Sequence, residues 1–134
     1  MTDKIYSQLK QQLKNSYSPY SKFKTAAAIE TDKGLFFGNN IENASYSATV
    51  CAERAAIFNA QVHGSKKFKK LYLISSSKKD DVIPCAVCLQ VMSEFFAANA
   101  PVIVYSFVGK KTTYKFSDLL PVSFSKKELD NAKK

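Results

Sequence analysis

The sequence has 134 residues, a length typical of one domain, and we expect residues 1–134 to form a single domain. Hydrophobic residues at 46% and charged residues at 23% exclude a disordered or fibrous chain, and no stretch approaches the roughly 20 apolar residues of a membrane helix. The 20 basic and 11 acidic residues give a net charge of +9, which makes nucleic acid a partner to consider.

The distribution of this charge argues against a dedicated nucleic-acid surface. Arg54 is the only arginine, and many of the lysines fall in short groups between apolar segments, where loops are expected. Since nucleic-acid surfaces favour arginine for bidentate phosphate and base contacts, we expect a solvated basic surface and no specific nucleic-acid partner. The start, Met1 to Lys4, lacks the apolar segment of a secretory signal, so we expect a cytoplasmic location and no association with a membrane.

In chain order, the first predicted element is an amphipathic helix over residues 3–15, in which Ile5, Leu9 and Leu13 recur every four residues. Two apolar runs then flank a short turn that contains Gly34, which predicts a hairpin. The predicted elements after the first helix are strands over 25–31 and 35–37, a helix over 52–62, a strand over 71–74, a helix over 84–98 opened by Pro84, strands over 101–107 and 112–116, and a short exposed helix from Ser125.

This order predicts an α/β fold with helices packed on a mixed sheet. Strand–helix–strand connections imply parallel neighbours, and they bring the starts of the helices over 52–62 and 84–98 toward one edge of the sheet. Only residues 108–111 join the last two strands, which is too short for a parallel crossover. We therefore expect these two strands to be antiparallel.

Three cysteines and the only arginine fall in two short motifs. Cys51 stands at the start of the helix over 52–62, while Cys85 and Cys88 stand three residues apart on the first turn of the next helix and share a face. An odd number of cysteines without a secretory signal argues against disulfides. Helix N-termini favour thiolates, and three thiolates with one open position is the ligand count of a catalytic zinc site.

Two charged residues near Cys51 could serve such a site. Arg54 could hydrogen-bond a ligand sulfur and so offset the net negative charge that three thiolates leave on a divalent ion. Glu53 is well placed beside the open position, where a carboxylate can take a proton from zinc-bound water and pass it on.

Two structural alternatives compete with this interpretation. The thiols could be ordinary buried core residues, but the Pro-Cys-x-x-Cys spacing at a helix start disfavours that. A closed structural site could use His63 as its fourth ligand, yet His63 lies about three turns, or roughly 18 Å, from Cys51 along the same helix. No helix lets both residues bind one ion.

The motifs resemble those of the zinc nucleobase deaminases, and in particular of the small, three-cysteine, homotetrameric cytidine deaminases that act on free nucleosides. The resemblance covers nearly the whole chain and implies a three-layer sandwich around a mixed five-stranded sheet. The segments that carry it are Tyr17–Phe23, the loop Gly38–Ser47, the zinc motifs Cys51–Arg54 and Pro84–Gln90, and the C-terminal residues Leu119-Leu120-Pro121 and Phe124-Ser125.

The resemblance implies zinc-dependent hydrolytic deamination of cytidine and 2′-deoxycytidine to uridine and deoxyuridine, with release of ammonia, as in pyrimidine salvage. It implies one Zn²⁺ per subunit, held by Cys51, Cys85 and Cys88, with water or hydroxide at the fourth position. Glu53 would move the proton from that water to N3 of the base and later to the leaving amino group, and Arg54 would hydrogen-bond the thiolates.

The resemblance also implies the substrate contacts. Asn40 and Glu42 would hold the ribose 3′-hydroxyl, and Phe23 would pack against the base. Tyr46 and Phe124 would help to complete the pocket across the subunit interfaces of a homo-oligomer, for which a tetramer is expected.

Three residues depart from the family's pattern: Leu89 stands in place of an arginine, and Ala86 and Ala26 stand in place of glycines. None removes a ligand or the glutamate, so we expect an active enzyme, and the sequence leaves open whether these departures alter its rate or substrate tolerance. Two other functions stay open. A nucleic-acid-editing deaminase would share the zinc motifs but pair its last two strands in parallel, and a non-catalytic zinc-stabilised binding module would make Glu53 dispensable.

Overall fold

The computed structural model describes residues 3–79 and 81–133. Its centre is a five-stranded sheet in the order β2-β1-β3-β4-β5. The strands are β1 (Thr25–Thr31), β2 (Gly34–Asn39), β3 (Phe68–Ser75), β4 (Pro101–Tyr105) and β5 (Lys111–Lys115). β3 and β4 run parallel, and the other neighbouring pairs are antiparallel. The sheet is therefore mixed and its last pair is antiparallel, as the sequence predicted.

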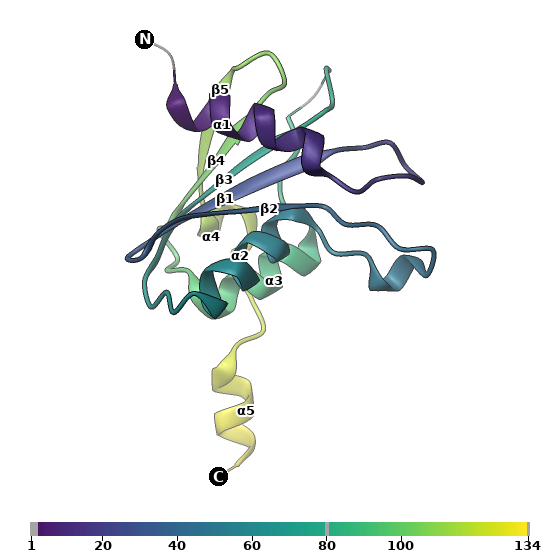
Figure 1. The fold of residues 1–134 in the computed structure, drawn as a ribbon. Helices are drawn as coiled ribbons and strands as arrows, with labels where there is room; N and C mark the ends of the chain where they lie inside the picture. The colour runs from purple at the N-terminus through teal and green to yellow at the C-terminus, as the bar shows by residue number, and fades with distance from the viewer. Residues whose placement is uncertain (1–2, 80, 134) are drawn as a thin grey trace.

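Helices cover both faces of this sheet (Figure 1). The helices are α1 (Lys4–Gln12), α2 (Ala52–Val62), α3 (Ala86–Phe95), α4 (Phe116–Leu119) and α5 (Lys126–Ala132). Side chains of a strand alternate between the two faces. In β1, Ala26 and Ala28 face the cluster that includes Leu9 of α1, while Ala27 and Ile29 face the cluster that includes α2 and α3. This arrangement confirms the three-layer sandwich.

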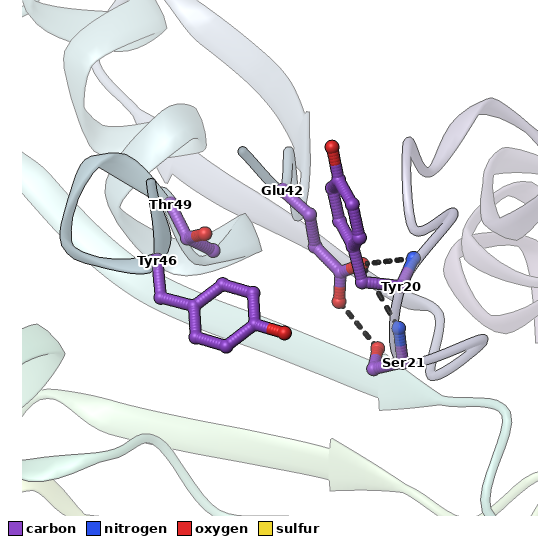
Figure 2. Close-up of a pocket in the computed structure, with 5 residues that line it drawn as sticks. All are labelled: Tyr20, Ser21, Glu42, Tyr46 and Thr49. Carbon is purple, nitrogen blue, oxygen red and sulfur yellow. Dashed lines mark hydrogen bonds between the residues drawn. The ribbon is translucent and has the colours of Figure 1, made fainter. Parts of the chain in front are cut away.

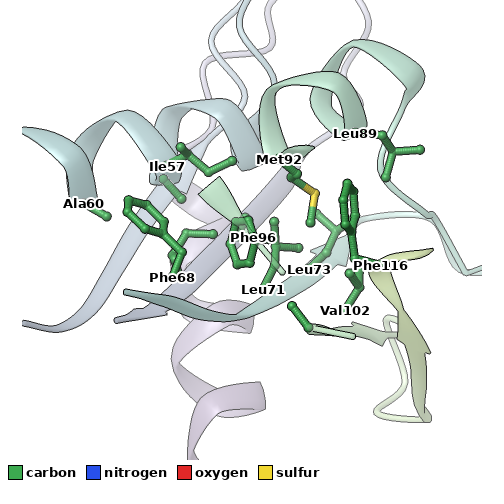
Figure 3. Close-up of a cluster of buried hydrophobic side chains, with 14 of the residues drawn as sticks. Ile57, Ala60, Phe68, Leu71, Leu73, Leu89, Met92, Phe96, Val102 and Phe116 are labelled. Carbon is green, nitrogen blue, oxygen red and sulfur yellow. The ribbon is translucent and has the colours of Figure 1, made fainter. Parts of the chain in front are cut away.

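The larger hydrophobic core lies between the sheet and the pair α2 and α3 (Figure 3). Ile57 of α2 and Met92 of α3 are fully buried in it together with Leu71, Leu73 and Val102 of the sheet. Burial of one side chain of this size contributes about 1.5–3 kcal/mol. The core therefore fixes both helices on the sheet, and with them the relative positions of the helix starts.

The helix limits agree with the prediction for α2 and differ for α1 and α3. The first helix ends at Gln12 and continues as a 3₁₀ turn over Leu13–Asn15, within the predicted range. α3 is shorter than predicted, because Cys85 is its N-cap and leaves Pro84 outside the helix. At the other end, Phe96 turns extended and forms a bridge with Phe68, so tertiary packing overrides the helical pattern.

The expectation of parallel neighbours holds for β3 and β4 but is wrong for β2 and β3. β1 lies between β2 and β3 and pairs antiparallel with both. The hairpin explains this order: β1 pairs with β2 along one edge, so only the other edge of β1 is available to pair with β3. The connection through α2 therefore skips one strand.

The strand limits differ by a few residues. β2 and β3 are longer than the predicted 35–37 and 71–74, and β4 ends before Phe107. Phe116 leaves the last strand and begins α4, a short helix that the sequence did not predict. α5 follows the cap residue Ser125 as predicted, and it extends away from the three layers (Figure 1). No helix in the described residues has the length and apolar character to cross a membrane.

Strand β2 and helix α2 touch backbone to backbone at Gly38. A Cβ atom there would lie 2.3 Å from the amide nitrogen of Ala56 and 2.6 Å from the carbonyl oxygen of Ala52. Real Cβ atoms essentially never come this close to other atoms, so a side chain would push α2 off the sheet. Cys51, at the start of α2, would move with it.

We expect Gly38→Ala to destabilise the protein by about 1–3 kcal/mol, the usual cost of overpacking, and to weaken zinc binding by displacing Cys51. Gly34→Ala is the matched control. Gly34 has a φ of +118°, and apart from its chain neighbours no described residue comes within 4 Å of a Cβ there, so alanine strains the turn and leaves α2 in place. Thermal unfolding and zinc content of both variants test this; full zinc content in Gly38→Ala would contradict it.

Candidate metal centre and active site

Three thiol groups from two helices converge where α2 and α3 begin. Cys51 is the N-cap of α2, Cys85 is the N-cap of α3, and Cys88 lies in the first turn of α3. The Sγ atom of Cys85 lies 3.9 Å from Cys51 Sγ and 3.6 Å from Cys88 Sγ, and all three sulfur atoms lie within 4.8 Å of one another. Residues that are 34 positions apart in the sequence thus meet at one point.

The three thiols cannot all lose their protons without a compensating charge. A hydrogen bond from the Cys88 thiol, together with the Arg54 guanidinium, lowers the pKa of Cys51 to about 5. The same hydrogen bond and burial raise the pKa of Cys88. One thiolate therefore opposes the ionisation of its neighbour, and a cation among the sulfur atoms would remove this conflict.

The donor set fits zinc. Thiolate sulfur is a soft ligand that suits Zn²⁺, and three protein ligands leave a fourth position open. Within the described residues the cluster contains these three cysteines and no fourth histidine, cysteine or carboxylate ligand. His63 caps the far end of α2, where its Nδ1 atom lies 2.8 Å from the Asn59 carbonyl oxygen, so it does not close the site.

Arg54 contacts the thiol cluster from the first turn of α2. Its Nη2 donates to Cys51 Sγ at 3.4 Å and to the Thr49 carbonyl oxygen at 3.5 Å. Its Nε is buried and has no hydrogen-bond partner in the part of the chain that the structure describes. A permanent cation at this distance favours the ionised form of the sulfur.

Glu53 lines a cavity of about 180 Å³ together with Cys51 and Cys85. Its side chain is only 5% exposed, and burial raises the pKa of Glu53 to about 7. A carboxyl group with this pKa can both accept and donate a proton near neutral pH. A cation bound to the neighbouring sulfur atoms would lower the pKa, because an opposite charge favours the carboxylate.

The same cavity is lined by Phe23 and Asn40, two of the residues expected to contact substrate. The amide of Asn40 is oriented by the protein: its Nδ2 donates to the Phe23 carbonyl oxygen at 2.7 Å, and its Oδ1 accepts from the Thr25 backbone nitrogen at 2.9 Å and from the Ser16 hydroxyl. An amide nitrogen carries two hydrogens, and these bonds use one of them. The other hydrogen has no acceptor among the described residues and can donate to a bound ligand.

Glu42 and Tyr46, also expected at the substrate, line a second pocket of about 440 Å³ with Tyr20, Ser21 and Thr49 (Figure 2). The Glu42 carboxylate accepts hydrogen bonds from the Ser21 hydroxyl and from the backbone nitrogens of Ser21 and Tyr20, and these bonds lower its pKa. Thr49 lines both pockets, so the two are adjacent.

Phe124 lines neither of these pockets. It is 57% exposed and lies beside α3, where Gln90 Nε2 donates to its carbonyl oxygen at 3.0 Å. Tyr46 is 76% exposed and does not line the cavity with the thiols. Within one chain, these two aromatic residues are therefore not brought together with the cysteines and Glu53.

Six residues that line this cavity beside Cys51 and Cys85 were not singled out from the sequence as site residues: Thr25 and Leu73 of the sheet, and Thr49, Val50, Val82 and Ile83. Each of the last four stands at most three positions before Cys51 or Cys85, and this proximity to a motif is the one signal that could have found them. Their aliphatic or hydroxyl side chains carry no distinctive chemistry, so their residue types alone did not indicate a functional site.

Comparison with known proteins gives matches over most of the chain. A family model for the cytidine and deoxycytidylate deaminase zinc-binding region matches residues 1–105. A cytidine deaminase from Sporosarcina psychrophila is 37% identical over 131 residues, which cover 97% of this chain and 96% of the relative. A cytidine deaminase from Halalkalibacterium halodurans is 36% identical over 117 residues, which cover 87% of this chain and 88% of the relative.

Solved structures show the same likeness in three dimensions. The crystal structure of cytidine deaminase from Burkholderia pseudomallei matches with a TM-score of 0.84 and 34% identity, covering 92% of this chain and all of that one. The cytidine deaminase from Mycobacterium tuberculosis matches with a TM-score of 0.75 and 29% identity, covering 90% and 94%. With its three thiols gathered at the helix starts, the chain belongs to the cytidine and deoxycytidylate deaminase zinc-binding family.

Proposed function

We propose that this protein is a cytidine deaminase, which hydrolyses cytidine and 2′-deoxycytidine to uridine and deoxyuridine and releases ammonia. The observation that carries the proposal is the cavity in which the buried Glu53 accompanies Cys51 and Cys85. A buried carboxyl group is costly for a fold, so its place beside a metal-binding cluster calls for a chemical role. Membership of the deaminase family supplies the reaction class.

Cys51, Cys85 and Cys88 would hold the zinc ion. When bound, zinc supplies the Lewis acidity that makes water a nucleophile near neutral pH. Arg54 would offset part of the negative charge of the three thiolates through its hydrogen bond to Cys51 Sγ.

Glu53 would move the protons of the hydrolysis. It would accept a proton from the attacking water and deliver it to N3 of the cytosine ring as the water oxygen bonds to C4. It would then take the second proton from that oxygen and pass it to the 4-amino group, so that the C4–N bond breaks, ammonia leaves and the C4 carbonyl forms. Two observations support this role: Glu53 is shielded from bulk water, and its side chain lines the same cavity as Cys51 and Cys85.

Phe23 and Asn40 would bind the nucleoside in the same cavity, with the Phe23 ring against the base and the free amide hydrogen of Asn40 toward the ribose 3′-hydroxyl. Glu42 would accept a hydrogen bond from that hydroxyl. Its carboxylate accepts three hydrogen bonds from the protein, and two carboxylate oxygens offer about four acceptor positions, so one remains.

The active protein would be a homo-oligomer, and we propose a tetramer in which Tyr46 and Phe124 complete the sites of neighbouring copies. Their exposure in one chain supports this proposal, as do the exposed apolar side chains of Val87, Val122 and Leu129 from the segments around Phe124. Phe124 and Leu129 line one groove, and exposed apolar side chains that lie together are typical of an interface. We place the reaction in pyrimidine salvage in the cytoplasm.

The two other functions have less support. The antiparallel β4–β5 pair disfavours a nucleic-acid-editing deaminase, whose last two strands would be parallel. A non-catalytic zinc-stabilised module would leave the buried Glu53 without a role. Release of ammonia from cytidine by the purified protein, measured beside a panel of nucleosides and a cytidine-containing oligonucleotide, tests the proposal directly.

Replacement of the proton carrier should separate catalysis from zinc binding. We expect Glu53→Gln to keep the fold and one zinc ion per chain and to lower kcat by about 10²–10⁴, the usual contribution of a general acid–base. Zinc content and thermal unfolding serve as controls for the site and the fold. A Glu53→Gln variant with near-normal turnover and normal zinc content would contradict the proposed role of Glu53.

Mixing two defective variants should test the shared sites. Phe124→Ala should raise the Michaelis constant, while Glu53→Gln should remove turnover. After subunit exchange, sites that combine Glu53 of one copy with Phe124 of another should recover activity, which neither variant incubated alone would do. Full activity in a protein that sediments as a monomer at the assay concentration would refute the assembly.

The basic surface should bind nucleic acid only nonspecifically. We expect a single-stranded oligonucleotide to bind weakly and without sequence preference, and to lose affinity steeply between about 50 and 200 mM salt, because counterion release drives such binding. Fluorescence anisotropy at several salt concentrations measures this. Tight binding that persists at high salt, with deamination of the bound strand, would instead favour an editing enzyme.

A further inference from the structure

The chain just before Phe23 has a backbone conformation that needs external support. Lys22 has a φ of +61°, and it is the only residue other than glycine with a positive φ in the described residues. This conformation is unfavourable for a residue with a side chain, so it persists only where neighbouring contacts fix it. Those contacts come from Ser21 and from the loop that follows β2.

The Ser21 hydroxyl joins these two segments. It donates to the Glu42 carboxylate, and its oxygen accepts a hydrogen bond from the Phe23 backbone nitrogen at 3.0 Å. The same carboxylate accepts from the backbone nitrogens of Tyr20 at 2.9 Å and Ser21 at 3.1 Å (Figure 2). One carboxylate therefore holds the turn through three donors.

Phe23 is fixed at both of its backbone polar groups by side chains. Its nitrogen donates to Ser21 Oγ, and its carbonyl oxygen accepts from Asn40 Nδ2 at 2.7 Å. Asn40 and Glu42 both follow β2, so one loop holds Phe23 from two sides, directly through Asn40 and through Ser21 for Glu42. Ser21 does not line the thiol cavity, whereas Phe23 does.

We propose that Ser21 is a positioning residue, which places Phe23 against the nucleobase by bridging the Glu42 carboxylate to the Phe23 backbone. The proposal rests on the proposed function, in which the Phe23 ring contacts the base. It also gives Glu42 a second role, because the carboxylate holds the Phe23 segment whether or not it meets the ribose. Ser21 should therefore affect binding of the base through Phe23, whether or not the ribose carries a 3′-hydroxyl.

Kinetics of three variants test the proposal. Ser21→Ala removes the bridge, Ser21→Thr keeps the hydroxyl, and Ser7→Ala is the matched control. The Ser7 hydroxyl on α1 donates to the Asp3 carbonyl oxygen and has no other hydrogen-bond partner in the described residues. We expect Ser21→Ala to raise KM for cytidine about tenfold, the effect of losing one hydrogen bond to a charged group, and to leave kcat within about twofold. Ser21→Thr and Ser7→Ala should behave as the unaltered protein.

A second substrate separates the two roles of Glu42. With 3′-deoxycytidine, Ser21→Ala should show the same rise in KM relative to the unaltered protein, because the bridge acts through Phe23. If the rise disappears with this substrate, Ser21 acts only through the ribose contact and the proposal is wrong. An unchanged KM for cytidine in Ser21→Ala would overturn it equally.

Limited proteolysis tests the Ser21 bridge by a measurement that does not depend on enzymatic activity. Trypsin cleaves after lysine, and loss of the bridge should speed cleavage after Lys22 several-fold while cleavage after Lys33, in the β1–β2 turn, stays constant. Mass spectrometry of the fragments identifies each cut. If the unaltered protein releases no ammonia from cytidine, the proposed function is wrong, but proteolysis still tests whether Ser21 holds the Phe23 segment. Unchanged cleavage after Lys22 in Ser21→Ala would rule out the Ser21 bridge.

Discussion

Three thiol groups held within 4.8 Å of one another impose the constraint on which the rest of the structure depends. Two of them come from one turn of α3, but the third comes from α2, so the starts of two helices must be held together by tertiary packing. The sheet provides this support. Helix α2 lies so close to β2 that Gly38 leaves no room for a Cβ atom, and Ile57 and Met92 bury α2 and α3 in one core.

Two neighbouring residues in the first turn of α2 serve the site in opposite ways. Arg54 directs its guanidinium to Cys51 Sγ and favours negative charge on the sulfur. Glu53 lies in the cavity, where burial favours the neutral acid. Because adjacent residues of a helix point about 100° apart, one turn can present a charge to the metal ligands and a proton carrier to the cavity. The helix start thus supplies a ligand, its counter-charge and an acid–base group.

Local patterns predicted much of the fold and of the metal cluster. Helix α2 and strand β1 follow from apolar runs with clear ends, and the short connection over 108–111 requires the antiparallel β4–β5 pair. The end of α3 and the strand order depend on contacts between distant residues, such as Phe96 with Phe68, which no local pattern contains. The bond between Ser21 and Glu42 spans 21 positions and is equally invisible to spacing rules. The cysteines could be identified from the sequence because they are rare and have distinctive chemistry. The hydroxyl and aliphatic residues that line the cavity are common residue types, so their identity alone did not indicate a site.

The separation of Cys51 and Cys85 along the chain has a consequence for how the protein holds together. The 34-residue loop between them includes α2 and β3, the helix next to the site and the strand at the middle of the sheet. A cation bound to both cysteines would close this loop as a covalent cross-link does, and would reduce the conformational entropy of the unfolded chain. Binding only to the folded form also stabilises it by mass action. The resistance of this protein to unfolding would then depend on the metal supply around it.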